Sequence, residues 1–406
     1  MPPKDEVRGW SRLIAGVADQ VIAGAVQDMH RAISDGTFRW IGPAGAPVKR
    51  AYDAVTEGVY GLVRASIRGA GEVGALAADT FGGDGDPHRA EPSPAALKAR
   101  AIAHGVVSDE LIALAPELDL ELTVRRDGRA ITLDPSGLSE AYPDARGRVA
   151  VFIHGLVDTE AVWAARAEDG PALPDVADDA GVTPVLVRYG TGRAVGRNGA
   201  ALAETLDRLV ANWPVPVTEL TLVGHSMGGL LARSACAVAA DRRHTWTAPL
   251  TDIVYLGTPH LGSWLEKAAN VGSWALRRYS RSAPIGTLLD ERSRGIKDLR
   301  FGTITEDAWG ETPIDDLLTG LVPDGPWLDD VTHHLIVGRL GTGERHPLRP
   351  VLGDALVRAG SASGTGRRRR IGEGGEVVVL PVGASHTRLV RAPEVSTMLG
   401  GLLEAR

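Results

Sequence analysis

A serine flanked by glycines occupies residues 224–229, in the run Gly-His-Ser-Met-Gly-Gly, with Ser226 at its third position. An apolar strand-like segment (220–223) precedes the run, and an apolar helix-like segment (230–240) follows it. A serine in a tight turn between a strand and a helix, with glycine two residues before and after it, is a nucleophile elbow. Glycine is needed there because a Cβ would collide with the neighbouring elements. The run predicts that Ser226 is a catalytic nucleophile; the alternative is a glycine-rich packing turn with an inert serine.

Acyl transfer by such a serine requires N–H donors for the oxyanion that develops. The helix after Ser226 begins with free N–H groups and a positive partial charge, so the Met227 N–H is the first predicted donor. His154 and Gly155 follow the first central strand-like segment, at the usual place of the second donor. Gly155 lets the backbone approach the substrate, and the N–H of Leu156 is the predicted donor. We expect the His154 side chain to be structural and hydrogen-bonded within this loop.

A base and an acid complete this chemistry, and with such an elbow the order along the chain is serine, acid, histidine. His386 directly follows the last strand-like segment (376–380), so we predict it to be the base that takes the Ser226 proton. Asp354 precedes a short apolar run upstream of His386 and is predicted to orient its imidazole and to stabilise the imidazolium. The alternatives for the acid are Asp329, Asp330 and Glu344.

The residues expected to surround the substrate are His154, Gly155, His225 and Trp264. Trp264 belongs to the segment 263–300, which follows the strand candidate 252–256 and is the candidate lid. The apolar residues of that segment would line an acyl pocket, or else form ordinary core packing. His260 is interpreted as a packing or pocket residue, because the acid must lie between the nucleophile and the base.

The elements that position these residues alternate between strand and helix from residue 148 onward. The strand candidates are Val149–Ile153, Thr183–Tyr189, Leu220–Val223, Asp252–Leu256, His334–Val337 and Glu376–Leu380. Several are continuous β-branched runs, as is typical of parallel strands that are covered on both faces. Helix candidates are 95–115, 200–213, 229–241 and 392–405, and an antiparallel hairpin is predicted for 118–133. The fold class is α/β, with a mostly parallel central sheet and helices on both faces.

The domain organisation follows from changes in pattern along the chain. Residues 1–81 carry two amphipathic stripes separated by a Gly/Pro breaker and predict a helical hairpin. This hairpin is a cap on the hydrolase or on a second copy of the chain, or alternatively a lipid-surface anchor. Residues 82–94 form a linker by composition, 95–147 a helix and antiparallel hairpin that lead into the sheet, and 148–406 the catalytic domain.

Composition limits the classes of partner. The formal net charge of the 406 residues is -7, so bulk attraction to nucleic acid is not expected. Cys236 is the only cysteine, so an intrachain disulfide cannot form, and no metal-ligand cluster of recognisable spacing is present. Neither a signal peptide nor a membrane-spanning helix is predicted, which favours a cytoplasmic protein. The protein would be peripheral at a lipid surface if the N-terminal helices bind one. Four arginines at 367–370 form a solvated loop or attract anionic lipid head groups.

On these residues the chain resembles the lipase-type α/β-hydrolases, in particular bacterial triacylglycerol-lipase-like and GPI-inositol-deacylase-like serine esterases. The matching stretches are 154–163, 188–199, 222–233, 253–266, 292–302 and 352–357. The resemblance covers about six-tenths of the chain, 150–390. In such lipases the Asp of an Asp-x-hydrophobic-Val motif is the triad acid, which supports Asp354. The resemblance implies hydrolysis of carboxylic esters, with an acyl-ester or lipid substrate and no cofactor; it does not extend to residues 1–80.

The functional hypothesis is a serine esterase or lipase that acts through an acyl-enzyme. An acyltransferase or a thioesterase would use the same triad, and the sequence does not separate them because pocket shape and water access choose the acceptor. A lipid-surface or oligomer-forming binding protein with a vestigial site is the hypothesis from another class. The intact elbow, His386 and Asp354 argue against it.

Overall fold

The computed structural model describes residues 94–166, 170–260, 330–338, 376–384 and 386–405, and single residues at 9, 298, 304 and 328. The predicted hairpin (1–81), linker (82–94) and lid (263–300) lie almost entirely outside the described residues. The chain divides into two compact units, and the sheet belongs to the unit made of Leu97–Gly105, Leu120–Glu266 and Arg294–Arg406.

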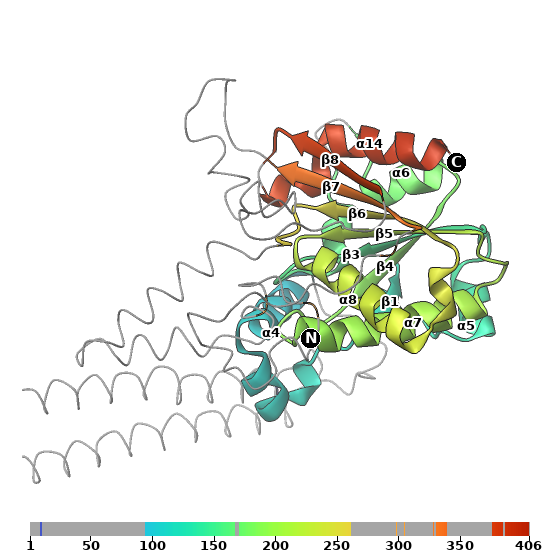
Figure 1. Cartoon of the computed structure of the whole chain (residues 1–406). Helices are drawn as coiled ribbons and strands as arrows, with labels where there is room; N and C mark the ends of the chain where they lie inside the picture. The colour runs from blue at the N-terminus through green and yellow to red at the C-terminus, as the bar shows by residue number, and fades with distance from the viewer. Residues whose placement is uncertain are drawn as a thin grey trace, which may run out of the picture. The chain divides into compact units, whose positions relative to one another are not determined.

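The described strands form one sheet of eight strands in the order β2-β1-β4-β3-β5-β6-β7-β8 (Figure 1). Their bounds are β1 Thr123–Arg126, β2 Arg129–Ala130, β3 Arg148–Ile153, β4 Thr183–Arg188, β5 Glu219–His225, β6 Leu250–Leu256, β7 Thr332–Gly338 and β8 Glu376–Val382. The six strands from β4 to β8 are parallel, whereas β1 runs antiparallel to β4 and to β2. The predicted α/β class with a mostly parallel sheet is confirmed.

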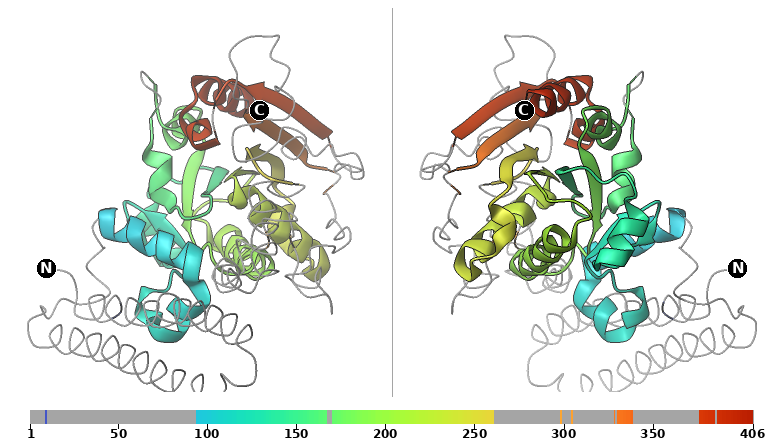
Figure 2. Two further views of the ribbon diagram at one scale, coloured as in Figure 1. Left: turned by 90° about the vertical axis from the view of Figure 1, so that its left-hand side faces the viewer. Right: turned by 90° about the vertical axis from the view of Figure 1, so that its right-hand side faces the viewer.

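Helices cover both faces of the sheet, as Figure 2 shows. One face packs against α5 (Pro135–Ala141), α7 (Val195–Asn212) and α8 (Met227–Arg242), and the other against α6 (Leu173–Asp179) and α14 (Pro393–Glu404). Strand β3 supplies both cores, because Val149 and Val151 point into the first and Ala150 and Phe152 into the second. Alternation across the pleat therefore explains why this strand is apolar at nearly every position.

The order in which strands are added to the sheet changes side at β3. The strand after β3 in the chain, β4, lies on one side of it, and the next strand, β5, lies on its other side. In open α/β sheets a crevice forms outside the carboxyl ends of the strands at such a switch point. The loops that follow β3 and β5 contain the predicted oxyanion donors and the predicted nucleophile, so the topology brings them to one place.

The predicted hairpin before the sheet is shorter than expected. The predicted strand at 118–124 begins only at Thr123, and the predicted return at 130–133 ends at Ala130. Thr123 pairs with Arg188, the last residue of β4, so β4 does not continue beside the residues upstream of Thr123. Pro116 instead starts a 3-10 helix, η3 (Pro116–Leu118).

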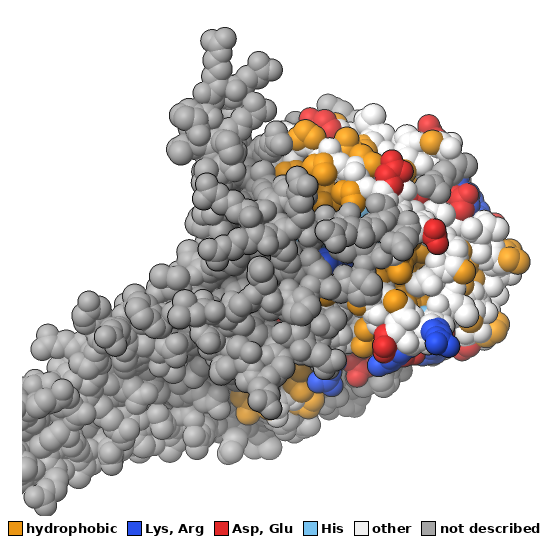
Figure 3. Space-filling model, in the orientation of Figure 1, with side chains coloured by type: hydrophobic (Ala, Val, Ile, Leu, Met, Phe, Trp, Pro, Cys, Tyr) orange, Lys and Arg blue, Asp and Glu red, His pale blue; other side chains and the backbone are white. Residues whose placement is uncertain are grey.

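The helix predicted at 95–115 is present as α4 (Pro94–Leu114). No helix within the described ranges is long and apolar enough to cross a membrane. On the face drawn in Figure 3, acidic and basic side chains are interspersed over the described surface.

Candidate active site

Ser226 lies in the turn between β5 and α8 with a left-handed backbone, φ 53° and ψ −118°. For a residue other than glycine this conformation costs about 1–3 kcal/mol and persists only where the surroundings hold it. The Ser226 N–H donates to the carbonyl of Leu256 on the neighbouring β6 (2.8 Å), and its carbonyl accepts from the N–H of Gly229 (3.1 Å). The strained turn is thus fixed on both sides of the serine.

The glycines of the turn are there because other backbone comes close. A Cβ on Gly224 would lie 2.6 Å from the backbone nitrogen of Gly229, and a Cβ on Gly228 would collide with the carbonyl oxygen of Ile153. Glycine at these positions lets the start of α8 sit directly against the ends of β5 and β3. The local geometry that the sequence predicted for the elbow is present.

His386 is brought to this serine from the far end of the chain. Its Nε2 lies 2.8 Å from Ser226 Oγ, across a sequence separation of 160 residues. His386 begins the 3-10 helix η7 (His386–Arg391), which follows β8, and both side chains are buried. With the serine hydroxyl donating, Nε2 accepts the hydrogen bond, which is the arrangement that a general base requires.

The two predicted oxyanion donors belong to residues that directly follow Gly155 and Ser226 in the chain. Within the described part of the chain, the N–H groups of Leu156 and Met227 make no hydrogen bond. The Met227 N–H begins α8, and Leu156 follows Gly155, whose backbone touches the elbow: a Cβ on Gly155 would lie 3.2 Å from the Ser226 Cβ. The residues that carry the two predicted donors therefore follow backbone at the serine or in contact with it.

His154 is fully buried, and its ring holds the loop after β3 to the end of β4. The imidazole stacks on Tyr189 (ring centroids 4.4 Å apart) and accepts at Nε2 from the Tyr189 N–H (3.3 Å). The Tyr189 hydroxyl donates to the His154 carbonyl (2.9 Å). Burial, which penalises the charged form, lowers the pKa of His154 to about 4. The His154 side chain therefore has a structural role in this loop, as we expected from the sequence.

Acid is expected to weaken the fold through this histidine. Its pKa is about 4 in the folded protein and 6.5 in an ordinary environment, so between these values the unfolded state binds the extra proton. The free energy of unfolding should then fall as the pH falls through this window, by about 1.4 kcal/mol per pH unit for one proton. Urea unfolding of wild type and His154→Gln between about pH 5 and 7.5 measures the contribution. Equal slopes in the two proteins would contradict it.

The other predicted substrate neighbours have different places. His225, the last residue of β5, is buried, and its Nε2 donates to the His386 carbonyl (3.1 Å), so it contacts the predicted base rather than a described substrate position. His260 is fully buried against Tyr255, with ring centroids 4.7 Å apart. Trp264 lies outside the described residues.

The acid of the predicted triad, Asp354, lies outside the described residues, as do its rivals Asp329 and Glu344. The remaining rival, Asp330, is exposed and stands before the first residue of β7. Because β7 is parallel to β6 and to β5, this is the amino edge of the sheet, opposite to the edge where Ser226 follows β5. The topology therefore argues against Asp330 as the partner of His386.

A buried charge cluster that includes Glu160 was not found from the sequence. Glu160, in the 3-10 helix η4 (Glu160–Ala164), accepts two hydrogen bonds from the Arg188 guanidinium, one of them 2.7 Å from Nε to Oε2. Arg125 Nε lies 3.9 Å from the same carboxylate, and all three side chains are buried. Burial, and then the neighbouring Arg188, lower the pKa of Arg125 to about 10. No local pattern signals this cluster, since its members come from a 3-10 helix and two different strands.

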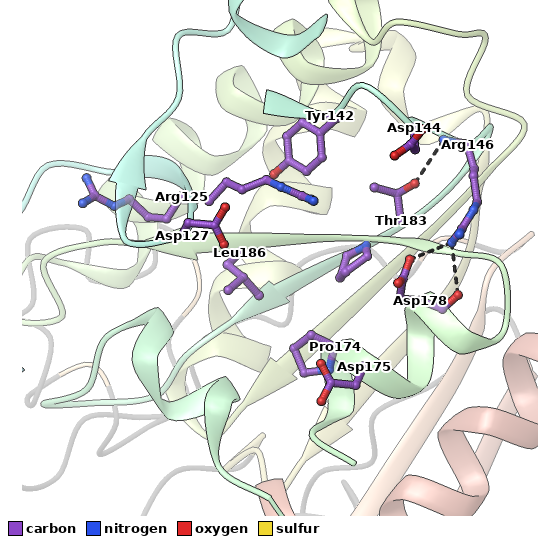
Figure 4. Close-up of a pocket in the computed structure, with 12 residues that line it drawn as sticks. Arg125, Asp127, Tyr142, Asp144, Arg146, Pro174, Asp175, Asp178, Thr183 and Leu186 are labelled. Atoms are coloured by element: carbon purple, nitrogen blue, oxygen red, sulfur yellow. Dashed lines mark hydrogen bonds and ion pairs between the residues drawn. The ribbon is translucent and has the colours of Figure 1, made fainter. Parts of the chain in front are cut away.

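A separate cavity of about 360 Å³ opens beside the amino end of β4, away from the carboxyl edge that carries Ser226 (Figure 4). It is lined by side chains of both charges, among them Arg126, Arg146, Asp144 and Asp178, and Arg146 is paired with Asp178 at 2.7 Å. Among the described residues, no group of three or more His, Cys, Asp or Glu side chains could hold a metal ion.

The chain was compared with protein families, with curated proteins and with solved structures. Residues 147–299 match the family described as "Putative serine esterase (DUF676)". No curated protein gives a significant match.

Solved structures with a similar arrangement include the mature lipase BlEst2 of Bacillus licheniformis, at 17% identity and a TM-score of 0.40, covering 63% of this chain and 91% of that one. They also include the metagenomic carboxyl esterase MGS0156, at 16% identity and a TM-score of 0.36, covering 63% and 75%. The thioesterase RedJ from Streptomyces coelicolor is similar at 16% identity and a TM-score of 0.34, over 64% and 86%. The match agrees with the serine-esterase part of the resemblance found in the sequence over residues 147–299, and the described strands form the mostly parallel α/β sheet that was predicted.

Proposed function

We propose that the chain is a carboxylic-ester hydrolase that acts through an acyl-enzyme on Ser226. The observation that carries the proposal is the 2.8 Å hydrogen bond between Ser226 Oγ and His386 Nε2 at a strained turn on a helix N-terminus. A serine hydroxyl is a weak nucleophile until an adjacent base takes its proton, and this arrangement supplies that base. The family match over residues 147–299 supports the same class of chemistry.

The reaction follows from the positions of these groups. Ser226 Oγ attacks the ester carbonyl carbon as His386 Nε2 takes the hydroxyl proton, and the N–H groups of Leu156 and Met227 bind the oxyanion. The tetrahedral intermediate collapses, the alkoxide takes the proton from His386 and leaves, and the acyl group remains on the serine. Water then attacks the acyl-enzyme with His386 again as base, which releases the acid and restores the serine. Asp354, chosen from its position in the sequence and supported by the resemblance, is proposed to hold the His386 tautomer.

The proposed substrates are acyl or lipid esters, and the proposed setting is the cytoplasm, with contact to a lipid surface if residues 1–81 bind one. Reaction with a fluorophosphonate probe, followed by mass mapping of the labelled peptide, tests the nucleophile. A panel of p-nitrophenyl esters from C2 to C16, run beside acyl thioesters of equal length, tests the substrate class. Label on Ser226 with turnover of the oxygen esters is the expected result. No label on the folded protein and no turnover would overturn the proposal, and preference for thioesters or for acyl transfer would redirect it.

A further inference from the structure

The oxyanion loop contains an unfavourable backbone conformation one residue after the predicted donor. Val157 has φ 54°, in the left-handed region. A β-branched residue is a genuine outlier there, because its side chain crowds the backbone. The loop needs contacts from outside to hold this turn, and therefore to hold the Leu156 N–H that precedes it.

Both backbone groups of Val157 are held by side chains from other elements. Its carbonyl accepts from Lys98 Nζ (2.9 Å), and its N–H donates to Thr191 Oγ1 (3.2 Å). Lys98 also pairs with the next side chain of the loop, with 2.7 Å between Nζ and Asp158 Oδ1. One lysine therefore bridges two consecutive residues of the loop.

Lys98 comes from α4, which the structure places against this loop by a close approach. A Cβ on Gly105 of the same helix would lie 2.5 Å from Val157 Cγ1, so glycine is what lets the helix lie so near. His104, fully buried, accepts at Nδ1 from the N–H of Gly192 (3.3 Å), in the segment that also contains Thr191. Residues of α4 thus contact the loops after both β3 and β4.

We propose that Lys98 is a positioning residue of the reaction, which holds the Val157 turn so that the Leu156 N–H is directed at the oxyanion. The inference rests on the proposed function and adds to it an element upstream of the matched segment, 147–299. Lys98 itself acts only through the backbone of the loop. The Lys98 side chain is half exposed, so its ion pair with Asp158 contributes little to the stability of the fold. Removing Lys98 should therefore weaken the binding of the transition state rather than destabilise the folded protein.

The test compares Lys98→Met, which keeps the aliphatic stem and removes the donors, with Arg242→Met. Arg242 makes a similarly exposed ion pair with Glu204 (2.6 Å) and is the matched control. Removing one oxyanion donor entirely lowers kcat by about 10²–10³-fold, so a donor that is only misdirected should lower it by roughly 10-fold. We expect this fall in Lys98→Met and not in Arg242→Met, with the same KM, melting temperature and midpoint of the pH–rate profile as wild type.

Two further readouts separate positioning from a general structural effect. A boronic acid that mimics the tetrahedral intermediate should bind Lys98→Met more weakly, in proportion to the loss of kcat/KM. Lys98→Arg, which restores a cationic donor, should recover most of the activity.

A wild-type rate in Lys98→Met, or a loss that comes with a lowered melting temperature or a shifted pH midpoint, would overturn the inference. These outcomes leave the proposed function intact as long as the fluorophosphonate still labels Ser226 in wild type.

Discussion

Replacing Ser226 by alanine is expected to lower kcat/KM for ester hydrolysis by roughly 10³–10⁶-fold, because the members of a triad act as a unit and its nucleophile has no substitute. The residual rate would come from the oxyanion donors, which can still polarise a bound ester. The substitution removes a single oxygen atom and leaves the 2.8 Å partner, His386, without its hydrogen bond. Steady-state kinetics with the best ester of the panel measures the loss.

The fold should survive this change. Alanine meets the same left-handed backbone as serine at φ 53°, and the two backbone hydrogen bonds of residue 226 do not involve the side chain. Thermal melting of Ser226→Ala beside wild type is the control. A folded variant that keeps more than a tenth of the wild-type rate would rule out Ser226 as the nucleophile.

Replacing Glu160 by glutamine is expected to cost about 3–5 kcal/mol of unfolding free energy. The neutral amide removes the Glu160 charge from beside two buried guanidinium groups, Arg188 and Arg125, and burial, followed by the neighbouring Arg188, already lowers the pKa of Arg125. Urea unfolding at neutral pH measures the change.

Glu204→Gln is the matched control for that measurement. Glu204 makes the same kind of contact with a guanidinium, 2.6 Å from Arg242, but both side chains are about half exposed. Exposed ion pairs contribute about 0–1 kcal/mol, so the two variants should differ by several-fold in cost. If Glu160→Gln and Glu204→Gln lowered the unfolding free energy by similar amounts, burial would not be what makes the Glu160 cluster important for stability.

The sequence predicted those parts of the molecule whose determinants are local. The elbow could be recognised because Gly224 and Gly228 mark close backbone contacts, and the continuous apolar run of β3 marks a strand covered on both faces. His386 could be chosen because it follows the last strand, and the structure brings it to the serine.

The short helices α5 and α6 were not predicted, although α5 carries a local start signal. Asp134 accepts from the N–H of Gly137 (2.8 Å) as the helix cap, and Pro135 follows it, so this boundary was readable. The predicted hairpin return, 130–133, ended just before this boundary and extended past the end of β2 at Ala130, because Ile131 and Leu133 alternate like a strand. Seven residues are also too few for a helical period to show.

Lys98 and the Glu160 cluster could not have been found from the sequence. In the sequence Lys98 resembles any charged residue on the exposed side of a helix. Only the position of α4 lets its Nζ donate a hydrogen bond to the Val157 carbonyl. Glu160 and Arg188 are 28 residues apart on different elements, and no periodic pattern relates them. Contacts of this kind depend on tertiary placement rather than on propensity.

The order in which the ribosome makes the chain has a consequence for when the enzyme can first act. Ser226 and His386 are 160 residues apart, so at 5–20 residues per second their codons are translated roughly 8–30 s apart. During that interval the nascent chain holds a nucleophile without a base. We therefore expect catalytic competence only after β8 and η7 have emerged, and chains that end before residue 386 to be inactive.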